Sequence, residues 1–220
     1  MCGRFSQTKS KHDIKKRFNV KKVPDTIVPL FNISPDGDVP VILNESPKDV
    51  SLARWGLIPS WAKEEKTQYS MINARAETLL EKPSYKRLIQ RKRCLIIADS
   101  FYEWKKINGK KAPYRIMLKN DELFAFAGLW DLWEKDGKSI TSCSIITTSP
   151  NKLCEKIHDR MPVILPRDKE NEWLSEIPVE KAIFILKPYD DKEMKAYEIS
   201  VKVNNPMNNS ADICVPVKKN

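Results

Sequence analysis

Two short turn signals constrain what this chain can fold into more than any other feature of its sequence. The dipeptides Asn108-Gly109 and Asp136-Gly137 each separate two runs of strand-forming residues. Asn-Gly and Asp-Gly favour the tight turns that join antiparallel strands, because these turns need positive φ angles. The sequence therefore predicts two antiparallel hairpins. Their strands are residues 101–107 with 112–118 and residues 124–133 with 140–148.

Outside the hairpins the predicted elements are short and prolines are frequent, which is typical of an α+β fold. We expect a single domain over residues 1–217, with a mainly antiparallel, curved or barrel-like β core and short peripheral helices, followed by a polar tail at 218–220. The predicted helices are 10–18, 75–91 with an interruption at Pro83, 149–157, 168–175 and a short one near 190. The remaining predicted strands are 39–43, 50–57, 94–98, 163–165 and 199–203.

The charge distribution is one-sided and predicts a polyanionic partner. The formal net charge is +10, and residues 1–115 contain 24 basic and 12 acidic residues, whereas the remainder contains 15 and 17. Basic clusters occur at residues 9–22, 86–93 and 105–111. Nucleic acid fits better than a membrane, since no basic amphipathic helix with large aromatics is evident. Each cluster by itself is also compatible with a solvated face.

The composition argues against metal and nucleotide cofactors, so we expect no cofactor. The five cysteines form no Cys-x-x-Cys pair, and there are only two histidines to assist them in a zinc site. None of the six glycines lies in a dinucleotide-binding or Walker loop. Without a signal peptide or a long apolar run, the protein is expected to be cytoplasmic with reduced thiols. No pattern indicates an oligomeric state.

Cysteine at position 2 is a reactive group of its own if Met1 is removed, because one residue then carries a thiol and an α-amine. The reference pKa of an α-amine is about 7.7 to 8.0, so a fraction of it is a neutral nucleophile at pH 7. An aldehyde would form an imine with this amine, and the thiol could close onto the imine carbon to give a five-membered thiazolidine. The position of Cys2 is also compatible with a frayed, unreactive terminus.

Three other segments carry polar residues in unusual settings. Asn73 and Arg75, separated by one alanine, could point the same way at a strand end, or could mark a helix start. Glu103 lies among aromatic residues after an apolar strand, where burial would raise its pKa and let it pass a proton. The alternative is that Glu103 lies on the solvent-exposed face of an amphipathic strand. His158 is suited to proton transfer, or it is an ordinary surface histidine after a helix.

Two further side chains fit contacts with nucleic acid. Arg160, two residues after His158, could bind a phosphate. Trp61 lies in a proline-containing loop and could stack on a base. Trp55, earlier in the same segment, is expected in the core.

Four ordered motifs resemble the SOS-response-associated peptidase family over almost the whole chain. They are Met1-Cys2-Gly3-Arg4-Phe5, Asn73-Ala74-Arg75-Ala76-Glu77, Phe101-Tyr102-Glu103-Trp104 and His158-Asp159-Arg160-Met161-Pro162. One departure is Ser100, where the family commonly has glycine. The resemblance implies binding of abasic sites in single-stranded DNA and capture of the sugar aldehyde on the N-terminal cysteine as a thiazolidine, which shields the lesion. DNA-bound protein would be associated with the nucleoid.

The resemblance also implies roles for individual residues. Cys2 would be the double nucleophile and Asn73 would fix its position. Glu103 would protonate or hydrogen-bond the sugar oxygen, and His158 would move protons during imine formation. The phosphates beside the lesion would be held by Arg4, Arg75 and Arg160.

Two other functions remain open at this point. An N-terminal-nucleophile cysteine peptidase or glutamine amidohydrolase also uses a Cys2 thiol and its α-amine, but an amidotransferase would need an oxyanion hole and an attached synthetase. We find no glycine-bearing loop that is suited to form an oxyanion hole, and we expect the chain to be too short for a second, synthetase domain. A non-catalytic single-strand binding module would use the basic surface alone.

Overall fold

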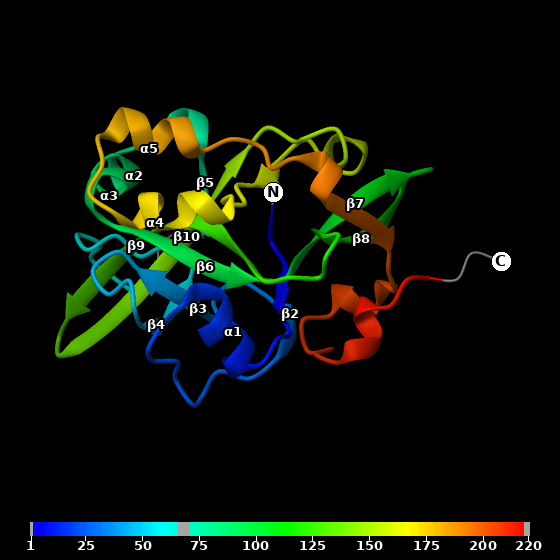
Figure 1. Cartoon of the computed structure of the whole chain (residues 1–220), viewed down its shortest axis with the longest axis horizontal. Coiled ribbons are helices and arrows are strands. Elements are labelled where there is room, and N and C mark those ends of the chain that lie inside the picture. Colours follow the sequence, from blue (N-terminus) through cyan, green and yellow to red (C-terminus); the bar gives the residue numbers. More distant parts are fainter. Residues whose placement is uncertain (1, 66–70, 218–220) are drawn as a thin grey trace.

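A closed barrel of five strands forms the centre of the computed structural model, which describes residues 2–65 and 71–217 (Figure 1). The strands pair in the order β10-β4-β3-β6-β9, and β9 pairs back with β10. All of these pairs are antiparallel except β4 with β10. The barrel strands are β3 (Asp38–Leu43), β4 (Val50–Trp55), β6 (Arg93–Ala98), β9 (Phe124–Lys135) and β10 (Lys138–Thr148).

Strand β6 is buried along its whole length, in keeping with the apolar sequence of residues 94–98. Leu95 and Ile97 belong to a core cluster shared with the helices. Cys94 and Ile96, on the opposite face of the strand, belong to a second cluster that contains Phe5. Alternate side chains of one strand therefore enter two cores.

A second, antiparallel sheet continues from the barrel, with the strand order β12-β8-β7-β1-β2. Its strand β7 begins two residues after β6 ends, so the chain passes directly from one sheet to the other. In Figure 1 the N-terminus points into the middle of the molecule. The strands are β1 (Phe5–Gln7), β2 (Leu30–Ile33), β7 (Ser100–Ile107), β8 (Lys110–Leu118) and β12 (Met194–Glu198).

Two short strands lie against β10 and bring two sequence motifs to it. Strand β5 (Asn73–Arg75) pairs with β10 in parallel, and β11 (Met161–Pro162) pairs with it antiparallel. Thr147 of β10 is a partner of both Arg75 and Pro162. Residues that are more than 80 positions apart in sequence therefore meet at one strand.

The helices are short, and α3 and α4 pack against the barrel strands β6 and β9. They are α1 (Lys11–Phe18), α2 (Pro83–Lys86), α3 (Leu88–Arg91), α4 (Arg167–Leu174) and α5 (Val179–Ile185). The single-turn 3-10 helices are η1 (Ala76–Thr78), η2 (Cys154–Lys156), η3 (Asp191–Glu193), η4 (Val201–Asn204) and η5 (Ala211–Cys214). Across the two described ranges, none of the helices has the length and apolar character needed to cross a bilayer.

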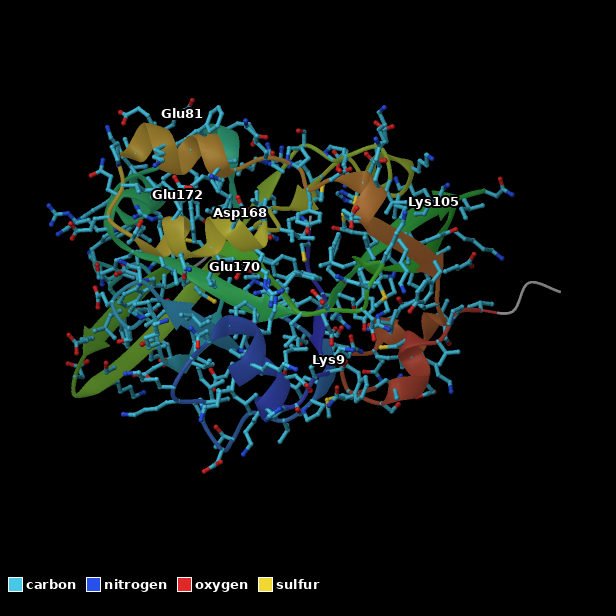
Figure 2. All side chains as sticks on the ribbon, viewed as in Figure 1. Lys9, Glu81, Lys105, Asp168, Glu170 and Glu172 are labelled. Atoms are coloured by element: carbon cyan, nitrogen blue, oxygen red, sulfur yellow. The ribbon has the colours of Figure 1, made fainter. Side chains whose placement is uncertain are left out.

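Helix α1 is fixed to α4 by a largely buried ion pair. The Arg17 guanidinium donates to both carboxylate oxygens of Glu170, at 2.9 and 2.7 Å. Glu170 lies between the two helices in Figure 2. Both side chains are close to fully buried, with 11% and 8% exposed, so the bidentate geometry compensates for the loss of water.

The predicted fold class is confirmed, and so are both hairpins. Strands β7 and β8 pair around Asn108-Gly109, and β9 and β10 pair around Asp136-Gly137. The helix near residues 10–18 is also confirmed, because Ser10 caps α1 in a capping box with Asp13. Strands β3, β4 and β6 and helix α4 lie where they were predicted.

Four predictions of secondary structure were wrong. Residues 75–91 form a strand end and separate helical turns, and Pro83 begins α2 at a position where proline is favoured rather than breaking a longer helix. The predicted helix 149–157 is reduced to η2. The predicted strand 163–165 makes only an isolated bridge at Ile164. The last strand is β12, whereas residues 201–204 form a 3-10 turn.

Strands β1 and β2 and helix α5 were not predicted. Two of these elements contain only three and four residues, and a pattern of alternation cannot be recognised over so short a length. The polar tail 218–220 lies outside the described residues.

A buried chain of polar side chains joins β1 to β7 and β8. Arg115 Nε donates to Ser100 Oγ at 2.8 Å, Ser100 is hydrogen-bonded to Ser6, and Ser6 donates to the Asp99 carboxylate. Because a hydroxyl has one proton, Ser100 must donate to Ser6. Ser100 therefore has a specific structural role, because it links Arg115 to Ser6.

We expect Ser100→Ala to lower the free energy of unfolding by about 1–3 kcal/mol, because Arg115 Nε and Ser6 Oγ lose a buried partner. Urea denaturation followed by circular dichroism measures this change. Ser139→Ala, at an exposed position of β10, is the matched control and should change stability by less than about 0.5 kcal/mol. Equal effects of the two variants would contradict the assigned role of Ser100.

Candidate active site

Cys2 lies fully buried three residues before β1, the strand that pairs with β7. Phe5 of β1 pairs with Phe101 of β7, and extension of this antiparallel register brings Gly3 opposite Glu103. The Cys2 Sγ lies 3.9 Å from its acceptor, the carbonyl of Arg4. The sheet thus fixes the N-terminal segment next to the Phe-Tyr-Glu-Trp motif.

Asn73 makes a direct contact with Cys2. Its side-chain Nδ2 donates to the Cys2 carbonyl at 2.7 Å. Asn73 is held in place because β5 pairs with β10 and because the Tyr85 hydroxyl donates to the Asn73 carbonyl at 3.2 Å. The Asn73 Oδ1 atom is buried and has no hydrogen-bond partner among the described residues. This acceptor oxygen is therefore available close to the N-terminal residue.

Glu103 is only 3% exposed, and this burial raises the pKa of its carboxyl group. The nearby His158 opposes the rise. Burial also raises the pKa of the Cys2 thiol well above its ordinary value, and the charge of Glu103 adds to that rise. The site therefore favours a protonated thiol and lets Glu103 hold a proton more readily than an exposed glutamate.

His158 lies between Glu103 and the backbone of its own loop. Its Nε2 is 3.9 Å from Glu103 Oε2, and its Nδ1 accepts a hydrogen bond from the Arg160 N–H at 3.1 Å. Nδ1 is also 2.9 Å from the exposed carboxylate of Asp159. The other ring nitrogen, Nε2, is the one that faces Glu103.

The three arginines have different surroundings. Arg160 forms a bidentate ion pair with Glu77, at 2.7 and 2.9 Å, and donates to the Thr147 carbonyl. Arg4 Nη1 donates to Asn32 Oδ1 and to the Val203 carbonyl, at 2.7 and 2.8 Å. The Arg75 side chain is exposed and forms no ion pair or hydrogen bond with another described residue.

Beside Glu103 and His158 lies a cleft of about 790 Å³. Trp104, Lys106, Lys111 and Asn204 line it together with the His158 loop. The sequence pointed to the lysines only as part of the basic cluster 105–111, and it gave no signal for Asn204. Lys106 and Lys111 face each other across the hairpin, where like charges repel, so an anion in the cleft would relieve that repulsion.

Trp61 does not line this cleft. Its side chain is 68% exposed and lies in a different pocket, beside α2 and α3. Trp55 is fully buried, as expected for a core residue. No group of three or more metal-binding side chains comes together in the part of the chain that the structure describes.

The structure thus brings Cys2, Asn73, Glu103 and His158 together from four distant segments. A family model for SOS response associated peptidase (SRAP) matches residues 1–206. The chain belongs to the SRAP family. This confirms the resemblance that the four motifs indicated.

Relatives of this SRAP chain include named proteins from bacteria and vertebrates. It is 47% identical over 220 residues to the abasic site processing protein YoqW of Bacillus subtilis, with 97% of this chain and 98% of that protein covered. It is 33% identical to the abasic site processing protein HMCES of Xenopus tropicalis, with 96% and 77% covered.

The SRAP fold of this chain also matches solved structures. A crystal structure of a protein from Bacteroides thetaiotaomicron superimposes with a TM-score of 0.91 and 29% sequence identity. The match covers 99% of this chain and all of that one.

We expect Glu103→Gln to stabilise the protein at about pH 7 but not at about pH 4. A raised pKa means that the folded state binds more protons than the unfolded state, so Glu103 costs stability as the pH rises above the ordinary glutamate value of about 4.3. Gln removes that cost. Thermal unfolding of both proteins across this pH range measures the difference, with the exposed Glu122→Gln as control. A constant difference at all pH values would contradict the assignment.

Proposed function

We propose that this chain binds single-stranded DNA at an abasic site and forms a covalent thiazolidine crosslink through Cys2 after removal of Met1. The observation that carries the proposal is the contact of Asn73 with the Cys2 carbonyl, at 2.7 Å, next to the Glu103–His158 pair. The names of the relatives, which process abasic sites, support the choice of substrate.

The proposed reaction needs no oxidant and no cofactor. The Cys2 amine attacks the aldehyde carbon of the ring-opened sugar, and a C–N bond forms to give a carbinolamine. Loss of one water gives the imine. The thiol sulfur then adds to the imine carbon, a C–S bond forms, and the thiol proton passes to the nitrogen. The net change is the loss of one water molecule.

The protonation states of the site fit an order in which the amine reacts first. Burial disfavours the Cys2 thiolate, whereas an α-amine is partly neutral near pH 7. Glu103, with its raised pKa, is suited to donate a proton to the sugar oxygen and to the departing water. His158 Nε2 is suited to return a proton to Glu103, because it faces that carboxylate.

We propose that the DNA backbone lies along the basic groups around the cleft. Arg75 is the strongest candidate for a phosphate contact, since its exposed side chain forms no ion pair or hydrogen bond with a described residue. Arg4 and Arg160 would contact phosphates while they hold the Val203 carbonyl and Glu77. An abasic nucleotide has no base to unstack, so its sugar enters the site at little cost, and a single strand avoids unpairing.

The Cys2 amine becomes free only when the Met1–Cys2 peptide bond is hydrolysed. Two routes would supply it: an aminopeptidase that accepts a small second residue, or self-cleavage, which would give a meaning to the peptidase in the family name. Synthesis of the chain in a reconstituted translation system without aminopeptidases, followed by intact mass measurement, distinguishes the two routes.

We expect Cys2→Ala to abolish crosslinking, because alanine retains the amine but cannot close the ring. A chain with an N-terminal extension before Cys2 should be equally inactive, since its amine is an amide. Incubation with abasic and intact oligonucleotides, a denaturing gel and intact mass measurement test both expectations. A thiazolidine on the extended chain would refute the mechanism. An amidohydrolase or a simple binding module would give no lesion-dependent covalent band.

We expect Arg75→Ala to weaken binding to abasic and intact strands alike, because a phosphate contact carries no lesion information. For single strands, the slope of log affinity against log salt concentration is about −0.7 per phosphate contact. This variant should therefore make the slope less steep by about 0.7. Arg160→Ala should flatten it less, because Glu77 already neutralises Arg160. The titration uses the Cys2→Ala background. An unchanged slope for Arg75→Ala would remove this residue from the phosphate contacts.

A further inference from the structure

Trp61 is the one predicted DNA-binding residue that lies in a pocket of its own, and this pocket has about 320 Å³ of space. Trp61 is 68% exposed, whereas Trp55, Trp130, Trp133 and Trp173 are each at most 4% exposed. An exposed indole has a face that is free to stack on a nucleic-acid base. The pocket also contains Ser60, Ser84, Arg87, Arg91 and Lys92. We call it the Trp61 pocket.

Arg87 and Arg91 supply positive charge that no described residue neutralises. Arg87 has helical backbone angles and joins α2 to α3, so the two arginines are four residues apart on one helical face. Like charges at this spacing destabilise a helix. Neither guanidinium forms an ion pair or hydrogen bond with the residues that the structure describes. This arrangement therefore costs stability unless an anion is bound.

The other charges of the pocket largely compensate each other. Lys92 Nζ lies 3.3 Å from Asp131 and 4.4 Å from the centre of the Trp130 ring. Its charge therefore takes part in an ion pair and a cation–π contact within the protein. Asp131 also accepts from the Ser60 N–H at 2.7 Å. Glu45 is the remaining acid at the pocket. The groups left for a ligand are an open indole face, two guanidinium groups, two serine hydroxyls and the Glu45 carboxylate, whose single negative charge is smaller than the charge of the two guanidinium groups.

These groups match the chemistry of one nucleotide. An indole face stacks on any base, and guanidinium groups bind phosphate through paired hydrogen bonds. Hydroxyl groups can complete the contacts with a phosphate or a sugar. The volume is at the lower end of the range for small-molecule sites, which suits a single nucleotide.

The Trp61 pocket is connected to the candidate active site through helix α2. Pro83 and Ser84 of α2 line the pocket, and Tyr85 of the same helix donates to the carbonyl of Asn73. Asn73 in turn holds the Cys2 carbonyl. In Figure 1, β5, α2 and α3 lie on one side of the N-terminus and the β7–β8 hairpin lies on the other. Figure 2 labels Lys105 on that hairpin.

We propose that the Trp61 pocket binds one nucleotide of the strand outside the lesion, with its base stacked on Trp61 and its phosphate held by Arg87 and Arg91. The role of the strand rests on the proposed function, whereas the capacity of the pocket for a nucleotide does not. A nucleotide could also come from solution as a free mononucleotide. A comparison of strands of different length with a free mononucleotide distinguishes these two sources.

The test measures noncovalent binding of intact, labelled oligothymidylates of increasing length, from about 4 to about 20 nucleotides, to protein in the Cys2→Ala background. We expect Trp61→Ala and the Arg87→Glu/Arg91→Glu pair to bind the shortest strands normally. With long strands Trp61→Ala should lose about 5- to 100-fold in affinity, which corresponds to one stacked base, and the arginine pair should also bind more weakly. The arginine pair should also flatten the salt slope by about 1.4, as expected for two phosphate contacts.

Two controls separate stacking and site-specific charge from general effects. Trp61→Phe should retain most of the affinity, because phenylalanine also stacks on bases. Lys15→Glu/Lys16→Glu makes the same change of charge at exposed positions of α1 and should have no length-dependent effect. All of these positions are exposed, and thermal unfolding checks that each variant is folded.

The results that overturn the proposal are distinct from those that overturn the proposed function. Equal losses at every strand length, or no loss at any length, would refute the Trp61 pocket as a site for the strand. Thymidine monophosphate could instead quench tryptophan fluorescence in the Cys2→Ala protein but not in its Trp61→Phe variant. That result, without any length effect, would assign the pocket to a free nucleotide. Loss of the covalent band with abasic DNA would refute the crosslinking proposal, and the length series would still report on the pocket.

Discussion

The site depends on the insertion of the N-terminal strand β1 between β2 and β7. A chain terminus normally frays, since few contacts oppose its conformational entropy. Here the carboxylate of Asp99, fully buried at the junction of β6 and β7, accepts hydrogen bonds from Ser6 and from the backbone and hydroxyl of Thr8. Arg115 lies 3.7 Å from the same carboxylate and balances its charge. These contacts fix a three-residue strand in place, so Cys2, three residues before the strand, has a defined position.

Strand β10 aligns the other parts of the candidate active site. It pairs with β5, which carries Asn73, and with β11, which follows the His158 loop. The ion pair between Arg160 and Glu77 then joins the two motifs by their side chains. Both motifs are thereby fixed relative to a long strand of the barrel, and a shift of either one would disturb the other. Glu103 belongs to β7 of the second sheet, whereas the His158 loop leads into β11 beside β10, so the 3.9 Å between them depends on how the two sheets pack.

The basic residues that dominate the first half of the sequence have several roles in the structure. In the cluster 86–93, Arg93 is buried and donates to the carbonyls of Trp173, Ile89 and Ser175, so it fixes the ends of α3 and α4. Arg87 and Arg91 of the same cluster are exposed in the Trp61 pocket. Sequence alone cannot separate these roles, since a buried arginine and a phosphate-binding arginine have the same side chain and differ only in their acceptors.

The sequence by itself determined the features that depend on local geometry or on fixed motifs. The two hairpins follow from turns that need positive φ, α1 follows from its capping box, and the four motifs identified the family. Tertiary structure decided what local preference leaves open. Strands β1 and β2 are too short to be recognised until they pair, and the extended conformation at Asn73 arises because β10 offers backbone partners. The contact of Asn73 with Cys2 spans 71 positions, and Trp61 lies in a pocket formed with helices from a later segment. Such contacts arise only when the sheets and helices pack, because their energy depends on distances between atoms that the order of residues does not specify.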